Sequence, residues 1–115
     1  MHELGVVFYI LDDLEKLAKE NDIHKINSVT LQIGEVSSVI PSYISSCFKW
    51  ATDKRELFSG AELKIETIDA ITHCDSCGCE YPTVKHGRIC PKCNSEKTWL
   101  LQGNEFLIKE IEAEE

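Results

Sequence analysis

Hydrophobic residues recur at steps of three and four near the start of the chain, and charged residues stand between them. This spacing predicts an amphipathic helix over residues 4–19. Its apolar positions are Leu4, Val7, Phe8, Leu11, Leu14 and Ala18. Asn21 and Asp22 are weak helix formers, so the helix is expected to end before them.

Two later segments, residues 28–34 and 63–67, alternate between apolar and polar residues. Strict alternation is typical of a strand with one face against a core. Between these strands, Pro41 suits a first helical turn, and the spacing of the apolar residues after it predicts a helix over residues 41–52. Those apolar residues are Ile44, Cys47, Phe48 and Ala51. A strand, helix, strand unit forms a right-handed crossover, so the two strands should be parallel.

A third strand is expected near Phe106 and Ile108, and it can pair back antiparallel. Residues 57–60 read as a loop, and the acidic residues 110–115 as a solvated end. The predicted fold is therefore α+β, with two helices and a mixed sheet of three strands built from residues 1–70 and 99–115.

Residues 71–98 interrupt this domain and hold five of the six cysteines, two of the three prolines and little aliphatic content. A segment of 28 residues is too short to bury a stabilising core, because chains below ~40 residues usually need a metal or disulfides. We therefore expect a small inserted domain, similar to a zinc ribbon, that a metal organises.

Cys74, Cys77, Cys90 and Cys93 form two Cys-x-x-Cys pairs separated by twelve residues. Four thiolates in a tetrahedral array suit a structural zinc ion with no open position for water. Gly78 follows the first pair and can supply the left-handed backbone of a metal knuckle. Two alternatives remain open: the same ligands hold iron in rubredoxin-like electron carriers, and two disulfides could form in an oxidising compartment.

Other cysteines and histidines have simpler interpretations. Cys79 is expected to be a spectator beside the metal, and His73 and His86 to be exposed loop histidines, although each of the three could enter the zinc shell. Cys47 lies on the apolar stripe of the second predicted helix, where free cysteine behaves as a small core residue. His24 follows a helix end and is expected on the surface.

Composition narrows the function classes. The chain has 115 residues, 43% hydrophobic residues and a net charge of −8, which indicates a soluble acidic protein. The longest apolar run, residues 6–11, is far too short to cross a membrane, and no signal peptide opens the chain, so we expect a cytoplasmic protein. Residues 71–98 carry four basic and three acidic residues, which argues against nucleic-acid binding.

The amino terminus offers a second metal site. The α-amine of Met1 and the amide and ring nitrogens of His2 can close adjoining chelate rings on one ion, and Glu3 can add a fourth donor. Nitrogen donors in a plane favour Ni(II) or Cu(II) over zinc. No nucleotide-binding loop of the type GxxxxGK[ST] and no catalytic trio is suggested, so we expect a carrier and no enzyme.

Four motifs together resemble the HypA/HybF family of hydrogenase maturation proteins, in the family's order and over nearly the whole chain. They are Met1-His2-Glu3-Leu4, Leu31-Gln32-Ile33-Gly34, the paired cysteines and Gly103-Asn104-Glu105. One departure is Gly5, where the family commonly has serine. Glycine there costs roughly 1 kcal/mol of helix propensity relative to alanine.

The resemblance implies a nickel metallochaperone that delivers Ni(II) for maturation of [NiFe] hydrogenase and, in some members, urease. It implies that Met1, His2 and Glu3 bind nickel and that Cys74, Cys77, Cys90 and Cys93 bind structural zinc. The implied partners are a nickel-handling GTPase and the precursor of the hydrogenase large subunit, with the chain a monomer or weak homodimer. The competing functions are a rubredoxin-like iron electron carrier and a zinc-ribbon interaction module without a second metal.

Overall fold

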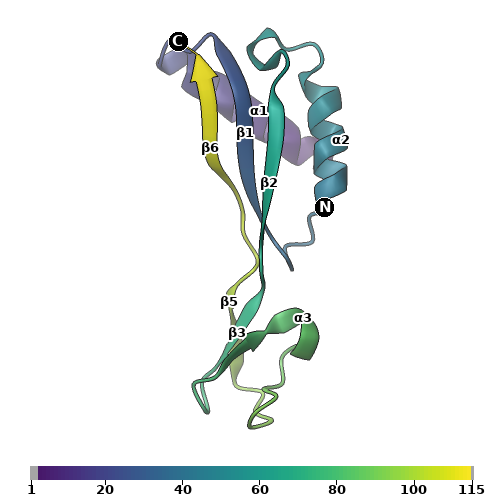
Figure 1. Cartoon of the computed structure of the whole chain (residues 1–115), viewed down its shortest axis with the longest axis vertical. Coiled ribbons are helices and arrows are strands. Elements are labelled where there is room, and N and C mark those ends of the chain that lie inside the picture. The colour runs from purple at the N-terminus through teal and green to yellow at the C-terminus, as the bar shows by residue number, and fades with distance from the viewer. Residues whose placement is uncertain (1–2, 115) are drawn as a thin grey trace.

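The computed structural model describes residues 3–114, which form an elongated molecule of 54 × 25 × 17 Å with two sheets at opposite ends (Figure 1). The radius of gyration is 17.9 Å, whereas a compact chain of this length has a value of about 13 Å. No helix among the described residues is long and apolar enough to cross a membrane.

The larger end is a sheet with two helices. It contains α1 (Glu3–Glu20), β1 (Lys25–Gly34), α2 (Pro41–Thr52), β2 (Glu62–Ile68) and β6 (Phe106–Glu114). The strand order is β2-β1-β6, with β1 parallel to β2 and antiparallel to β6. The predicted parallel pair and the antiparallel third strand are both confirmed.

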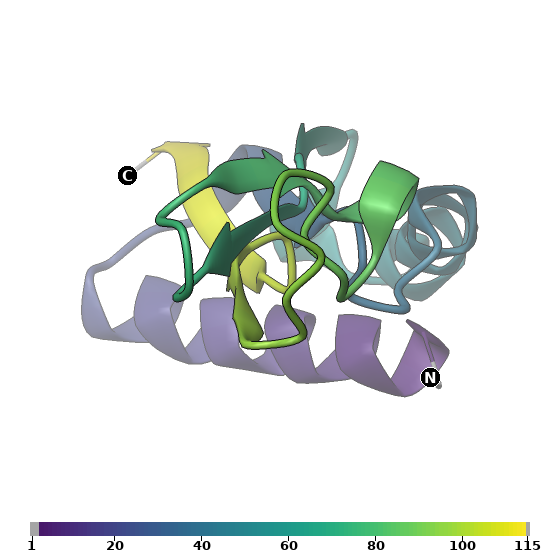
Figure 2. The same cartoon turned by 90° about the horizontal axis from the view of Figure 1, so that it is seen from below.

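The central strand β1 divides the sheet into an apolar face and a polar face. Val29, Leu31 and Ile33 are at most 1% exposed and pack against the helices, which lie behind the sheet and along its β2 side (Figures 1 and 2). On the other face, ion pairs between β2 and β6 cross the central strand. They join Lys64 to Glu112 at 3.1 Å and Lys109 to Glu66 at 2.8 Å.

Two predictions for this region are wrong. Residues 57–60 are more than a loop, because the 3₁₀ helix η1 (Glu56–Phe58) places Phe58 in the core with 1% exposure. The acidic end is also no solvated tail, since β6 continues to Glu114 and pairs with Lys25. The cause is that β1 begins at Lys25, three residues earlier than its alternation predicts, and so offers β6 a longer partner.

The smaller end is an antiparallel sheet in the order β4-β3-β5. It comprises β3 (Ile71–Cys74), β4 (Glu80–Pro82), the short helix α3 (Thr83–His86) and β5 (Thr98–Gln102). This sheet carries the cysteines, so the α+β class with a separate cysteine-bearing unit is confirmed. Its strand β5 continues four residues past residue 98, where the inserted domain is expected to end.

Three chain segments cross tightly between the two sheets. A Cβ atom added to Gly34 would overlap the carbonyl group of Gly103, and one added to Gly103, whose φ is +117°, would overlap Ala70. Two carboxylates bind backbone groups here: Glu35 accepts from the N–H of Ala70 at 2.8 Å, and Glu105 accepts from the N–H of Gly103 at 2.8 Å. The junction is therefore a packed, hydrogen-bonded crossing.

Candidate metal centre

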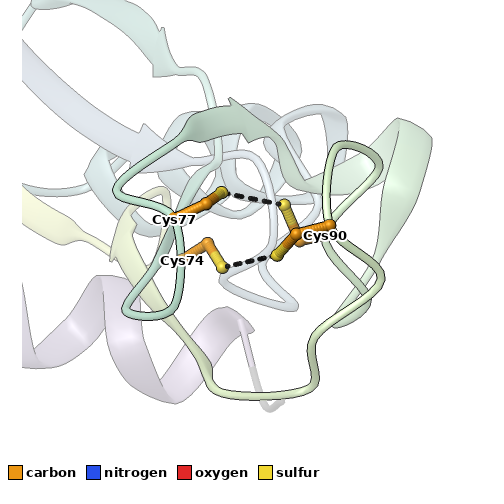
Figure 3. A group of neighbouring side chains, drawn as sticks. Cys74, Cys77 and Cys90 are labelled. Carbon is orange, nitrogen blue, oxygen red and sulfur yellow. Dashed lines mark hydrogen bonds between the residues drawn. The ribbon is translucent and has the colours of Figure 1, made fainter.

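The four paired cysteines converge at the end of the molecule farthest from α1 and α2. The sulfur atoms of Cys74, Cys77, Cys90 and Cys93 all lie within 4.8 Å of one another. Contacts of 3.6 Å join Cys74 to Cys93 and Cys77 to Cys90 across the two pairs. Figure 3 shows the sulfurs pointing toward one another from two loops.

The first loop is a tight knuckle at the end of β3. The N–H of Cys74 donates to the carbonyl of Cys79 at 2.8 Å, and the N–H of Gly78 donates to the carbonyl of Cys74 at 2.8 Å. Gly78 has a φ of +76°, the left-handed conformation that glycine adopts without steric cost. The sequence prediction for Gly78 is confirmed.

The second loop repeats this pattern at Cys90. Its N–H donates to the carbonyl of Ser95 at 3.0 Å, and the N–H of Asn94 donates to the carbonyl of Cys90 at 2.8 Å. Asn94 stands four residues after the first cysteine, as Gly78 does, and has a φ of +62°. Asparagine tolerates this conformation, so the role of Asn94 could have been found by aligning the two pairs. The hydroxyls of Ser76 and Ser95 join the loops at 2.7 Å.

The sulfur positions fit a tetrahedral metal ion. Four sulfurs at about 2.3 Å from a zinc ion lie about 3.8 Å apart, and the two cross-pair contacts measure 3.6 Å. Cys74 and Cys90 are fully buried, whereas Cys77 and Cys93 are exposed. The cluster is thus suited to hold one metal ion near the surface, and its four thiolates would fill all four positions of a tetrahedral ion.

The thiols influence one another's ionisation. A backbone N–H from Cys79 lowers the pKa of Cys77, but desolvation and the neighbouring thiols outweigh it and raise that pKa to about 12. Desolvation raises the pKa of Cys90, but the N–H groups of Cys93 and Lys92 and the thiol of Cys77 lower it to about 6. Crowded thiols cannot all carry a negative charge unless a cation compensates them. The four-thiolate state therefore requires a metal ion.

Three neighbours of the cluster differ in their surroundings. Cys79 is half-buried, and its sulfur contacts the carbonyl of Glu80 at 3.6 Å instead of joining the cluster. His86 is exposed as predicted, but it is the last residue of α3 and not a loop residue, and its ring contacts that of Tyr81. The prediction for His73 is wrong, because it lies in strand β3 and not in an exposed loop.

His73 is held in place by its cross-strand neighbours. Its ring lies 5.2 Å from that of Trp99, and its two nitrogens lie 3.7 Å from carboxylate oxygens of Asp75 and Glu80. The indole N–H of Trp99 also donates to Asp75 at 3.0 Å. No pattern in the sequence predicts this arrangement, which depends on the register of β3 with β4 and with β5.

Of the three expected nickel ligands, Met1 and His2 lie outside the described residues. Glu3 begins α1 and is half-buried. Cys47 packs against the main core and His24 is exposed, as expected for a core residue and a surface residue.

Comparison with known proteins identifies the family. A family model described as hydrogenase/urease nickel incorporation, metallochaperone, hypA matches residues 1–113. The chain belongs to the HypA family. Members are metallochaperones and not enzymes, so this protein acts in nickel incorporation for hydrogenase or urease maturation.

Full-length relatives agree with this membership. The chain is 38% identical to a hydrogenase maturation factor HypA of Trichodesmium erythraeum, over 100% of this chain and 97% of that protein. It is 34% identical to the corresponding factor of Geobacter metallireducens, over 99% of this chain and 100% of that protein. The solution structure of the nickel metallochaperone HypA from Helicobacter pylori superposes with a TM-score of 0.69 at 30% identity, covering 98% of this chain and 97% of that one. The HypA fold thus extends over the whole described chain.

Proposed function

We propose that this protein binds Ni(II) through the α-amine of Met1, the amide and ring nitrogens of His2 and a donor of Glu3. The family match carries this proposal, because it includes the amino-terminal residues that offer these donors. Nitrogen donors in one plane suit Ni(II). A site at the end of the chain can also exchange its ligands one at a time with an acceptor.

Acid should release the proposed nickel. The donors bind only when deprotonated, and ordinary pKa values are about 7.7 to 8.0 for an α-amine and about 6.5 for histidine. Nickel affinity should therefore be full above these values and fall as the pH drops through them.

We further propose that Cys74, Cys77, Cys90 and Cys93 hold zinc. When bound, the ion would offset the charge of four thiolates and hold the two knuckles together without an open coordination position. Iron in the same ligands would produce a coloured, redox-active protein. Elemental analysis of the purified protein separates the two metals, and one zinc per chain without iron is expected.

The proposed domains are a nickel-binding domain of residues 1–70 with 99–115 and an inserted zinc-binding domain of residues 71–98. The proposed partners are a nickel-handling GTPase and the large-subunit precursor of a [NiFe] hydrogenase, in the cytoplasm, where paired cysteines stay reduced for metal binding. Their exchange of nickel with the terminus would need no enzymatic step by this chain.

A nickel titration by calorimetry tests the proposal on zinc-loaded, tag-free protein that starts at Met1. One tight Ni(II) per chain is expected, and His2→Ala should weaken binding at least tenfold while zinc content and thermal stability stay unchanged. His24→Ala is the matched control, because it removes an exposed histidine at the other end of α1. Equal nickel affinity in the His2→Ala protein would refute the assignment.

A further inference from the structure

An uncovered apolar groove lies between α1 and α2. Its volume is about 630 Å³, and its walls include Phe8 of α1 and Trp50 of α2. The two rings meet edge to face with centroids 6.1 Å apart. Trp50 is 68% exposed, which is unusual for the side chain that gains most from burial at protein interfaces.

The groove lies beside apolar side chains that the core covers only in part. Leu4 and Phe8 belong to the predicted apolar face of α1, yet Leu4 is 38% exposed and Phe8 is only half-buried. Tyr43 stands seven residues before Trp50, on the same side of α2, and is 57% exposed. Adjoining aromatic residues left open on two helices mark an interaction surface.

Two lysines without an ion-pair partner among the described residues line this groove, although the chain carries a net charge of −8. Lys49, Lys54, Arg55 and Asp53 are its charged residues, and the charge of Arg55 is compensated by carboxylates of α1. Within residues 3–114, neither Lys49 nor Lys54 has an ion-pair partner within 4.0 Å. Their charges remain available to an incoming acidic group.

Arg55 differs from these lysines because it is fixed within the protein. It forms ion pairs with Asp12 and Glu15 of α1, and its guanidinium lies 5.6 Å from the centre of the Phe8 ring. These contacts join the connection after α2 to α1 and place the guanidinium beside the Phe8 ring. The groove is therefore preorganised, which lowers the entropy lost on binding.

We propose that this groove docks an acidic segment of a partner protein that carries one apolar anchor. The anchor packs between Phe8 and Trp50, and carboxylates of the segment pair with Lys49 and Lys54. A second copy of this chain fits the groove poorly, because two molecules of charge −8 repel each other. The two lysines of the groove favour an acidic segment over a basic one.

Docking here would bring a partner near the start of α1. Phe8 follows Glu3 by five residues, about 8 Å along the helix axis. The inference goes beyond the proposed nickel site and does not depend on it. Because its test contains no nickel, failure of the docking surface and failure of the nickel assignment can be told apart.

The probe is a twelve-residue peptide of glutamate and aspartate with one central phenylalanine. Binding to nickel-free, zinc-loaded protein is followed by amide chemical shifts and by the fluorescence of Trp50 in a Trp99→Phe background, which removes the other tryptophan. Two control peptides replace the phenylalanine by serine or the acidic residues by lysine. We expect shifts confined to the groove, and binding at least tenfold weaker for both controls.

The double charge reversal Lys49→Glu with Lys54→Glu should weaken binding of the acidic peptide at least tenfold. Trp50→Ala should weaken it by a similar factor. Lys85→Glu with Lys97→Glu is the control, a charge change of the same size at two exposed lysines outside the groove. Equal binding of the lysine peptide, or unchanged affinity in the Lys49→Glu with Lys54→Glu variant, would overturn the proposal. It would also be overturned if groove resonances shifted with protein concentration alone, since a second copy would then cover the groove.

Discussion

The two ends of the molecule are stabilised by different means. The helix-bearing end has a continuous apolar core that includes side chains as large as Phe58 and Leu11, whereas the buried cluster at the cysteine end consists of Cys74, Tyr81 and Cys90. Burial of apolar area is worth roughly 25 cal/mol per Å², and the cysteine end has little such area. The comparison shows that one chain can combine a domain held by its core with a unit held by its ligands.

Hydroxyl groups supply further links at the cysteine end. Thr72 and Thr83 contact at 2.6 Å, and the hydroxyl of Tyr81 donates to the carbonyl of Gly87 at 2.9 Å. A net hydrogen bond contributes only about 1 kcal/mol, so these links orient the loops without folding them. The metal is left as the main stabilising element.

Removal of the metal should therefore have the largest effect and should act on one end alone. In Cys90→Ser, or after chelation, we expect residues 71–102 to lose their dispersed amide resonances. The helix content should persist, because α1 and α2 pack on the other sheet. Structural zinc contributes about 10–16 kcal/mol in small metal-dependent folds, far more than the local hydrogen bonds can replace.

Amide resonances in nuclear magnetic resonance report whether the cysteine end is folded, and circular dichroism reports the helix content of the other end. Cys47→Ser is the control, a cysteine outside the metal cluster. Loss of α1 and α2 in the Cys90→Ser protein, or a cysteine end that stays folded after chelation, would contradict the two-part description.

A cavity introduced into the main core should have the opposite effect, because it should destabilise the helix-bearing end and leave the cysteine end folded. Leu31 lies in the central strand with 1% exposure, so Leu31→Ala should lower the free energy of unfolding by about 2–5 kcal/mol. The cysteine end should keep its resonances below the new melting temperature. Leu107→Ala on β6, where the side chain is 43% exposed, should change stability far less. Equal losses in both variants would show that burial does not distinguish these positions.

Periodicity predicted the helix-bearing end well because each element has one covered face. The predicted helix over residues 41–52 coincides with α2, and α1 differs from its prediction by one residue at each end. Phe58 was missed because a single buried aromatic in a short connection has no period. The extension of β6 to Glu114 was missed because its acidic residues face solvent, where strand pairing leaves no hydrophobic signal.

The cysteine end was predictable in chemistry and less so in detail. The spacing of Cys74, Cys77, Cys90 and Cys93 predicted their convergence, which depends on local turns. The contacts of His73 depend on cross-strand register, and residues 71–98 contain too little hydrophobic alternation to predict it. The role of Glu35 at the junction was not predicted either, because a carboxylate that binds a backbone group 35 residues away looks like any surface acid. Glu105 belongs to the motif Gly103-Asn104-Glu105, but the motif does not reveal its bond to the N–H of Gly103.

The junction gives a smaller, mechanical test of the comparison. Gly34→Ala places a methyl group against the backbone of Gly103, and such overpacking costs about 1–3 kcal/mol. We expect lower thermal stability and altered orientation of the two ends, measured by residual dipolar couplings. Gly5→Ala is the matched control, since the same change within α1 should raise stability by up to about 1 kcal/mol. Unchanged couplings and stability in Gly34→Ala would show that the crossing tolerates a side chain.

The polar face of the main sheet should give the smallest effect, and one that depends on pH. A hydrogen bond from Lys109 lowers the pKa of Glu66, so folding favours its ionised form. This stabilisation is present above the pKa of the unfolded state, about 4.3, and is lost as the pH falls through the lower folded value. The melting temperature of the wild type should therefore fall slightly more between pH 6 and pH 3 than that of Glu66→Gln. Glu62→Gln, an exposed position on the same strand, should follow the wild type, and identical curves for the wild type and both variants would show that the ion pair adds nothing to folding.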